Sequence, residues 1–140
     1  MRYALIGCGR IASNHIKAAI NNKLELAAVC DVIPENMENL LEKHDLNKDT
    51  SIGRYTDYKQ MISENGFDLI GIATESGIHA EIALFCIENG INVIIEKPMA
   101  MKIVDAEEII KQSEKKNVVV SACHQNRFNV AIQETRKAIE

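Results

Sequence analysis

The 140-residue sequence has no long apolar run, no close pair of cysteines and no extended basic cluster. No stretch approaches the roughly 20 apolar residues of a membrane-spanning helix. The first apolar run, residues 3–6, is also too short for a signal peptide. With a net charge of −4, the chain has no general attraction to nucleic acid or to an anionic membrane. We therefore expect a cytoplasmic protein with a small-molecule partner.

The four cysteines are arranged in a way that argues against both a disulfide framework and a metal site. Cys8, Cys30, Cys86 and Cys123 form no Cys-x-x-Cys pair and have no metal-ligand spacing to the four histidines. Three of them lie in apolar runs, where free cysteine behaves as a small buried side chain. We expect reduced core thiols and no bound metal.

Short apolar runs alternate along the chain with segments of helical periodicity. Strands are expected at residues 3–6, 24–30, 51–55, 67–73, 91–95 and 118–123. Helices are expected from residue 11, from residue 34, over 57–64, 76–89 and 102–116, and from about residue 128. Continuous apolar strands between amphipathic helices predict an α/β fold with a doubly wound, six-stranded parallel sheet of the Rossmann type.

The segment Gly7-Cys8-Gly9-Arg10-Ile11-Ala12 lies between the first strand and the first helix, with the spacing of a dinucleotide-binding loop. Gly7 permits a sharp turn, Gly9 allows the backbone to approach a pyrophosphate, and Ala12 allows close packing of helix on strand. The helix that follows offers free N–H groups and a partial positive charge to phosphates. A nucleotide-sugar enzyme or a methyltransferase could carry a similar loop.

Asp31 ends the second strand, at the distance from the glycine loop that a dinucleotide site requires. A carboxylate there accepts hydrogen bonds from adenosine ribose hydroxyls and repels a 2′-phosphate, so NAD is favoured over NADP. The alternative role for Asp31 is to cap the helix that begins at Pro34.

Polar residues follow the fourth, fifth and sixth strands, at the edge of the sheet where ligands bind. They are Thr74-Glu75-Ser76 with His79, Glu96-Lys97-Pro98, and His124-Gln125-Asn126-Arg127. Because Lys97 follows an apolar run, we expect a partly desolvated ammonium that donates to a substrate hydroxyl, with Glu96 orienting it or contacting the cofactor. The alternative is a surface lysine paired with Glu96.

The chain resembles the N-terminal domain of the glucose–fructose oxidoreductase / inositol dehydrogenase (Gfo/Idh/MocA) family over nearly its whole length. The resemblance is carried by the glycine loop with His15, by Asp31, by residues 74–79 and above all by Glu96-Lys97-Pro98. It implies NAD as the cofactor, with NADP less favoured, and hydride transfer to or from the hydroxyl carbon of a sugar or polyol.

The resemblance also implies roles for individual residues. Lys97 would be the catalytic residue that hydrogen-bonds the substrate hydroxyl. The residues implied for the dinucleotide site are Gly7, Gly9, Arg10, Ile11, Asp31, Thr74, His79 and Glu96, with Gln125 and Asn126 approaching the nicotinamide end. The run 125–129 is similar to that of members acting on nucleotide-linked or amino sugars. His15 and His79 keep the alternative of packing or capping within helices.

We expect residues 1–123 to form the dinucleotide-binding Rossmann domain, and residues 124–140 to form a strand end and a helix leading into a further domain. The last expected helix has no later segment to pack against, so the chain looks like part of a longer protein or a shortened natural relative. The C-terminal α/β substrate domain of the family, with its catalytic base and much of its homo-oligomer interface, is absent from these residues. We expect cofactor binding with little turnover, and the alternative is a stand-alone NAD-binding or sensing module.

Overall fold

The computed structural model describes all 140 residues and contains one six-stranded parallel sheet with the order β3-β2-β1-β4-β5-β6. The strands are β1 (Arg2–Ile6), β2 (Glu25–Cys30), β3 (Gly53–Tyr55), β4 (Leu69–Ile72), β5 (Asn92–Ile95) and β6 (Val120–Ala122). The helices are α1 (Ala12–Asn21), α2 (Pro34–Glu42), α3 (Tyr58–Glu64), α4 (His79–Glu88), α5 (Ile103–Lys116) and α6 (Val130–Ile139). Two short 3₁₀ turns, η1 (Ser76–Ile78) and η2 (Gln125–Phe128), precede α4 and α6. The predicted doubly wound α/β fold is confirmed.

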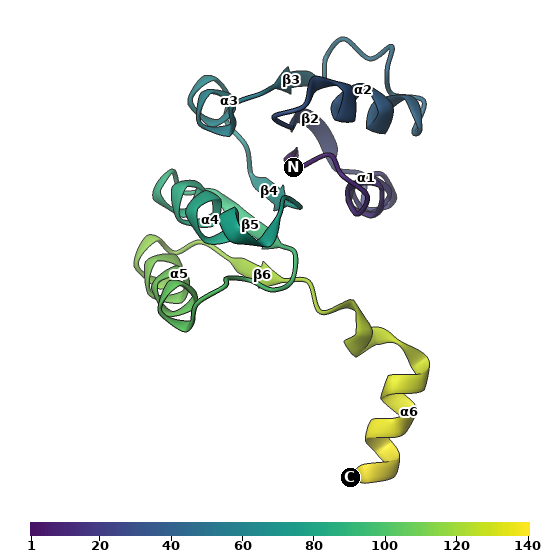
Figure 1. Ribbon diagram of the computed structural model, residues 1–140, viewed down its shortest axis with the longest axis vertical. Coiled ribbons are helices and arrows are strands. Elements are labelled where there is room, and N and C mark those ends of the chain that lie inside the picture. The colour runs from purple at the N-terminus through teal and green to yellow at the C-terminus, as the bar shows by residue number, and fades with distance from the viewer.

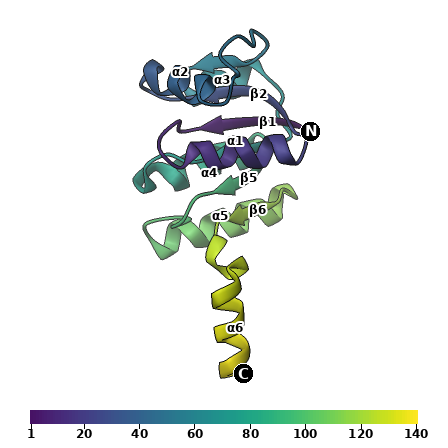
Figure 2. The same ribbon diagram turned by 90° about the vertical axis from the view of Figure 1, so that its right-hand side faces the viewer.

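Helices cover both faces of the sheet, with α1 and α2 on one face and α3, α4 and α5 on the other (Figure 1). Figure 2 shows α1 in front of the sheet, on the face turned toward the viewer, with its axis roughly along β1. Each face has its own buried cluster, and the cluster under three helices is larger than the one under two. Burial on both faces explains why the strands are continuous apolar runs rather than alternating ones.

The ends of the helices follow from local residue chemistry. Pro34 occupies the first turn of α2, where its missing N–H costs nothing. Asp57 caps α3 by accepting a hydrogen bond from the Lys59 backbone N–H at 2.8 Å. Asn117 directly follows α5 with a φ of 54°, and Gly90 lies one residue beyond the C-cap of α4 with a φ of 73°. None of the helices has both the length and the apolar character needed to cross a membrane.

The order of the strands reverses direction between β1 and β4, and this switch point determines where a ligand can bind. The chain leaves β1, β4, β5 and β6 at the same edge of the sheet, because all strand pairs are parallel. After β6 the chain turns away, and α6 extends from the sheet with exposed side chains (Figures 1 and 2). The sheet edge next to the switch point is therefore the place to look for a site.

Candidate functional site

A cavity of about 290 Å³ opens at the switch point. Gly7 and Gly9 from the loop after β1, Asp31 from the end of β2 and Thr74 from the end of β4 line it. Its remaining wall is largely apolar and includes Ile78. A glycine loop, a carboxylate and an apolar wall in one cavity suit the phosphate, ribose and adenine parts of a dinucleotide.

The two loop glycines differ in what surrounds them. Gly7 has a φ of +92°, and a Cβ there would lie 2.5 Å from the Ala73 carbonyl carbon, so only glycine fits this turn. A Cβ on Gly9 would meet no atom within 4 Å. Gly7 is thus required by the fold itself, whereas the space beside Gly9 is open to a ligand such as a pyrophosphate.

Asp31 holds the loop through its carboxylate. One oxygen accepts a hydrogen bond from the Cys8 N–H at 2.7 Å, and the other accepts from the Ile33 N–H at 2.9 Å and the Asn36 side chain at 3.1 Å. Ile33 immediately precedes α2, so its hydrogen bond to Asp31 is similar to the helix-capping role considered for this residue. Asp31 also lines the cavity. A single carboxylate therefore organises the loop and faces the ligand space.

Arg10 and Ile11 complete the glycine loop in different ways. Arg10 is exposed and borders a second cavity of about 260 Å³ together with Gly9 and Ser13. Its guanidinium is therefore free to approach a phosphate. Ile11 is half-buried and packs against the core cluster on the α1 face, so its side chain supports the loop from behind.

Glu96 is buried directly after β5, at 7% exposure, and its carboxylate collects donors from three parts of the chain. It accepts from the His15 Nε2 at 3.1 Å, from the Gln125 Nε2 at 3.2 Å and from the Lys97 backbone N–H at 3.3 Å. A buried carboxylate is stable only with such partners. Glu96 contacts Lys97 through this backbone N–H and not through the ammonium, and Glu96 does not line the cavity next to the glycine loop.

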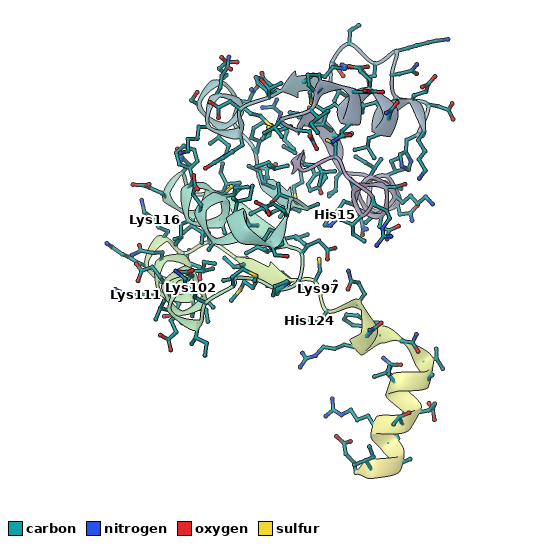
Figure 3. All side chains as sticks on the ribbon, viewed as in Figure 1. His15, Lys97, Lys102, Lys111, Lys116 and His124 are labelled. Atoms are coloured by element: carbon teal, nitrogen blue, oxygen red, sulfur yellow. The ribbon has the colours of Figure 1, made fainter.

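Lys97 itself is exposed, which corrects the expectation of a desolvated ammonium. Glu96 takes the inward position after the apolar strand, so Lys97 points outward (Figure 3). The ion-pair alternative is also wrong, because the Lys97 ammonium makes no salt bridge with Glu96 or any other carboxylate. Together with Gln125 and Asn126, Lys97 lines a cavity of about 240 Å³ beside η2.

His79, which the resemblance implies for the dinucleotide site, is 1% exposed and does not line the cavity at the glycine loop. Its Nδ1 lies 2.8 Å from the Pro98 carbonyl oxygen and its Nε2 lies 3.1 Å from the Thr74 carbonyl oxygen. The ring therefore ties the end of β4 to the loop after β5. Its location at the start of α4, after a 3₁₀ turn, aims it inward beneath that loop.

Sequence reasoning missed Tyr3 and Cys123, which lie in the cluster around Glu96. The Tyr3 hydroxyl lies 3.5 Å from the His15 Nδ1, and the potential metal-ligand atoms of His15, Glu96 and Cys123 lie within 4.8 Å of one another. Burial, and then the Glu96 carboxylate, raise the pKa of the Cys123 thiol to about 11. No local spacing signals this grouping, because the residues come from distant parts of the chain.

Comparisons with known proteins agree with this geometry. The model of the GFO_IDH_MocA family, an oxidoreductase family with an NAD-binding Rossmann fold, matches residues 1–124. Among curated relatives, the myo-inositol 2-dehydrogenase of Thermotoga maritima is 25% identical over 100% of this chain and 41% of its own length. The trans-1,2-dihydrobenzene-1,2-diol dehydrogenase of Xenopus tropicalis is 24% identical over 96% of this chain and 40% of its own length.

Solved structures show the same fold. The WlbA dehydrogenase from Chromobacterium violaceum, in complex with NADH and UDP-GlcNAcA, is 32% identical with a TM-score of 0.87, over 99% of this chain and 39% of its own. The present chain thus spans about 40% of the length of the relatives that it matches. The family match excludes the methyltransferase alternative for the glycine loop. The chain belongs to the Gfo/Idh/MocA family of oxidoreductases, and its fold is that family's NAD-binding Rossmann domain.

Proposed function

We propose that this chain is the cofactor-binding part of a dehydrogenase that moves hydride between NAD and the hydroxyl carbon of a sugar or polyol. The observation that carries the proposal is Lys97, an exposed and unpaired ammonium that lines a cavity at the same sheet edge as the glycine loop. A lysine used only for stability would be expected to pair with a carboxylate, and Lys97 does not.

The residues at the switch point fit the cofactor. The open space at Gly9 and the exposed Arg10 would take the pyrophosphate, and Asp31 would accept hydrogen bonds from the adenosine ribose. Ile11 would support the glycine loop and His79 would support the end of β4, without contact with the ligand. Thr74 would border the ligand. Bound NAD supplies the hydride acceptor at its nicotinamide ring.

At the other end, Lys97 would donate a hydrogen bond to the substrate oxygen and stabilise negative charge on it as the hydroxyl proton passes to a catalytic base, which the resemblance implies outside these residues. Gln125 and Asn126, which line the same cavity, would border the nicotinamide and the substrate. Glu96 would hold the Lys97 backbone in place. Apart from Gln125 and Asn126, we assign dinucleotide binding to residues 1–123 and a connecting role to residues 124–140.

A nucleotide-linked sugar is the substrate class that we favour. Support comes from the WlbA dehydrogenases of Chromobacterium violaceum and Bordetella pertussis, which are 32% and 31% identical and were both solved with UDP-GlcNAcA. The curated relatives include dehydrogenases of myo-inositol and D-apiose, so simpler polyols and sugars are the competing class. The non-catalytic sensing alternative has no support among these relatives, because all of them are dehydrogenases.

The test is Lys97→Met, with Lys102→Met as the matched surface control, since both lysines are exposed (Figure 3). NADH formation from NAD would be followed with UDP-GlcNAcA, myo-inositol and D-apiose, in a longer protein in which these residues are joined to a substrate domain, because we expect little turnover from residues 1–140 alone. We expect Lys97→Met to lower turnover by about 10²- to 10⁴-fold while NADH binding stays unchanged, as for other proton-handling groups. Turnover that survives in Lys97→Met, or that falls equally in the control, would contradict the role of Lys97.

A further inference from the structure

We propose that His15, on α1, is a positioning residue for the nicotinamide half of the site, acting through Glu96. This inference rests on the proposed function. His15 touches no cavity at the glycine loop or beside Lys97, so it has no place among the residues that would contact cofactor or substrate directly. Its effect has to pass through the carboxylate that it contacts.

The His15–Glu96 pair is buried and close. The side chains of both residues are 9% exposed, and the His15 Nε2 lies 3.1 Å from a Glu96 oxygen. A carboxylate can only accept, so we assign the ring proton that faces Glu96 to Nε2. The Tyr3 hydroxyl lies at 3.5 Å from Nδ1, on the opposite side of the ring. The imidazole is therefore held from both sides.

Glu96 passes this constraint on to residues of the cavity beside Lys97. The same carboxylate accepts from the Lys97 backbone N–H and from the Gln125 side chain. Lys97 and Gln125 both line the cavity where we place the nicotinamide and the substrate. Figure 3 shows His15 and Lys97 on the same flank of the molecule, where the chain leaves the sheet toward α6.

Helix α1 makes this arrangement useful, because it begins directly after the glycine loop and carries His15 one turn later. A rigid helix thus connects the backbone that would hold the pyrophosphate with the carboxylate that holds Lys97. Without His15, Glu96 would lose one of its donors while buried. The carboxylate would then turn toward water, and the Lys97 backbone and the Gln125 amide would lose their anchor.

The competing view is a buried pair that only stabilises the fold. The two views differ in which half of the cofactor they affect. A loss of stability alone would lower the affinity for every ligand of the domain equally. A loss of positioning would weaken a ligand that carries nicotinamide and leave one that lacks it unchanged. NADH and ADP-ribose are such a pair of ligands, since ADP-ribose has the adenosine and pyrophosphate parts but no nicotinamide.

The experiment is calorimetric titration of the 140-residue chain with NADH and with ADP-ribose. We expect His15→Leu and the shorter, polar His15→Asn to weaken NADH binding about tenfold, the size of one charge-assisted hydrogen bond, and to change ADP-ribose binding less than about twofold. His15→Gln, whose amide N–H can replace the Nε2 donor, should restore NADH binding. His44→Leu is the matched control, because His44 also contacts α1, at the Ser13 hydroxyl, but lies away from Glu96.

Equal weakening of both ligands in His15→Leu and His15→Asn, or no weakening of either, would overturn the positioning role. Failure of His15→Gln to restore NADH binding would do the same. If the unaltered chain binds NADH no more tightly than ADP-ribose, the nicotinamide end contributes nothing and the inference fails while dinucleotide binding stands. If the unaltered chain binds neither ligand, the proposed function itself fails.

Discussion

The cavity at the glycine loop and the cavity beside Lys97 are built on different principles. At the glycine-loop end, the contacts come from the backbone and from one carboxylate, Asp31, within the first two strands. At the Lys97 end, the contacts come from side chains on α1, after β5 and after β6, which meet at Glu96. The contacts of Asp31 therefore lie close to β1 and β2, whereas those of Glu96 join α1 to the ends of β5 and β6.

The two ends also differ in what they leave free. Gly7 and Asp31 are engaged within the protein, so the loop has its shape before any ligand arrives. Lys97 is exposed and has no carboxylate partner. A preformed loop suits tight and general binding of a dinucleotide, whereas an unpaired ammonium suits chemistry on a second molecule.

The largest effect is expected at Gly7. Gly7→Ala forces a side chain into a positive φ of 92° and against the Ala73 backbone, and should destabilise the chain by about 3 kcal/mol and abolish NADH binding. Gly9→Ala is the matched control for folding, because its Cβ meets no protein atom. Urea unfolding should leave Gly9→Ala near the unaltered stability although NADH binds more weakly. Equal stability of both variants would contradict the distinction.

A smaller effect on cofactor binding is expected from a substitution at Asp31. Loss of its carboxylate removes an acceptor for the ribose hydroxyls and the charge that repels a 2′-phosphate. Asp31→Ala should weaken NADH about tenfold and narrow the difference between NADH and NADPH. Titration of both cofactors measures this. Asn36→Ala removes one partner of Asp31 but keeps the carboxylate, so it should preserve the selectivity. Equal affinity of the unaltered chain for NADPH and NADH would show that Asp31 has no such role.

The smallest effect concerns the reactivity of two thiols, Cys8 in the glycine loop and Cys123 beside Lys97. Burial is the larger cause and a neighbouring carboxylate the smaller cause that raise the pKa of each thiol. The pKa of Cys8, beside Asp31, is raised to about 12, and that of Cys123, beside Glu96, to about 11. Because only thiolate is alkylated, the half-buried Cys123 should react with iodoacetamide before the buried Cys8. The rate at Cys123 should still rise with pH beyond the usual thiol range, up to its raised pKa.

Glu96→Gln sharpens this comparison by removing one charge. It should lower the pKa of Cys123 and speed its alkylation a few-fold at about neutral pH, while the rate at Cys8 stays the same. Mass spectrometry of the alkylated peptides separates the two sites. Faster reaction at Cys8 than at Cys123 in the unaltered chain would contradict the burial that the structure shows.

The fold was largely predictable because its signals are local. Apolar runs of strand length, Pro34 at a helix start and Gly90 at a helix end all act within a few residues of where they stand. The segment expected as one helix over residues 76–89 begins instead as the 3₁₀ turn η1 before α4. Hydrophobic periodicity does not distinguish the two in so short a stretch.

The site was predictable only in part. The glycine loop and Asp31 were recognisable, because their spacing along the chain reflects a single strand-helix-strand unit. The exposure of Lys97 and the burial of His79 were not, since they depend on which residue after a strand turns inward. The contact of His15 with Glu96 joins residues 81 positions apart and leaves no periodic trace.

The sequence by itself determined the alternation of strands and helices, the glycine turn and the acid that follows it, because these depend on backbone freedom and hydrophobic pattern over short distances. Only the tertiary structure decided what surrounds Glu96, because the parallel order of the strands brings the ends of β5 and β6 beside α1. Burial there gives the carboxylate its partners, and one of them is the Lys97 backbone N–H.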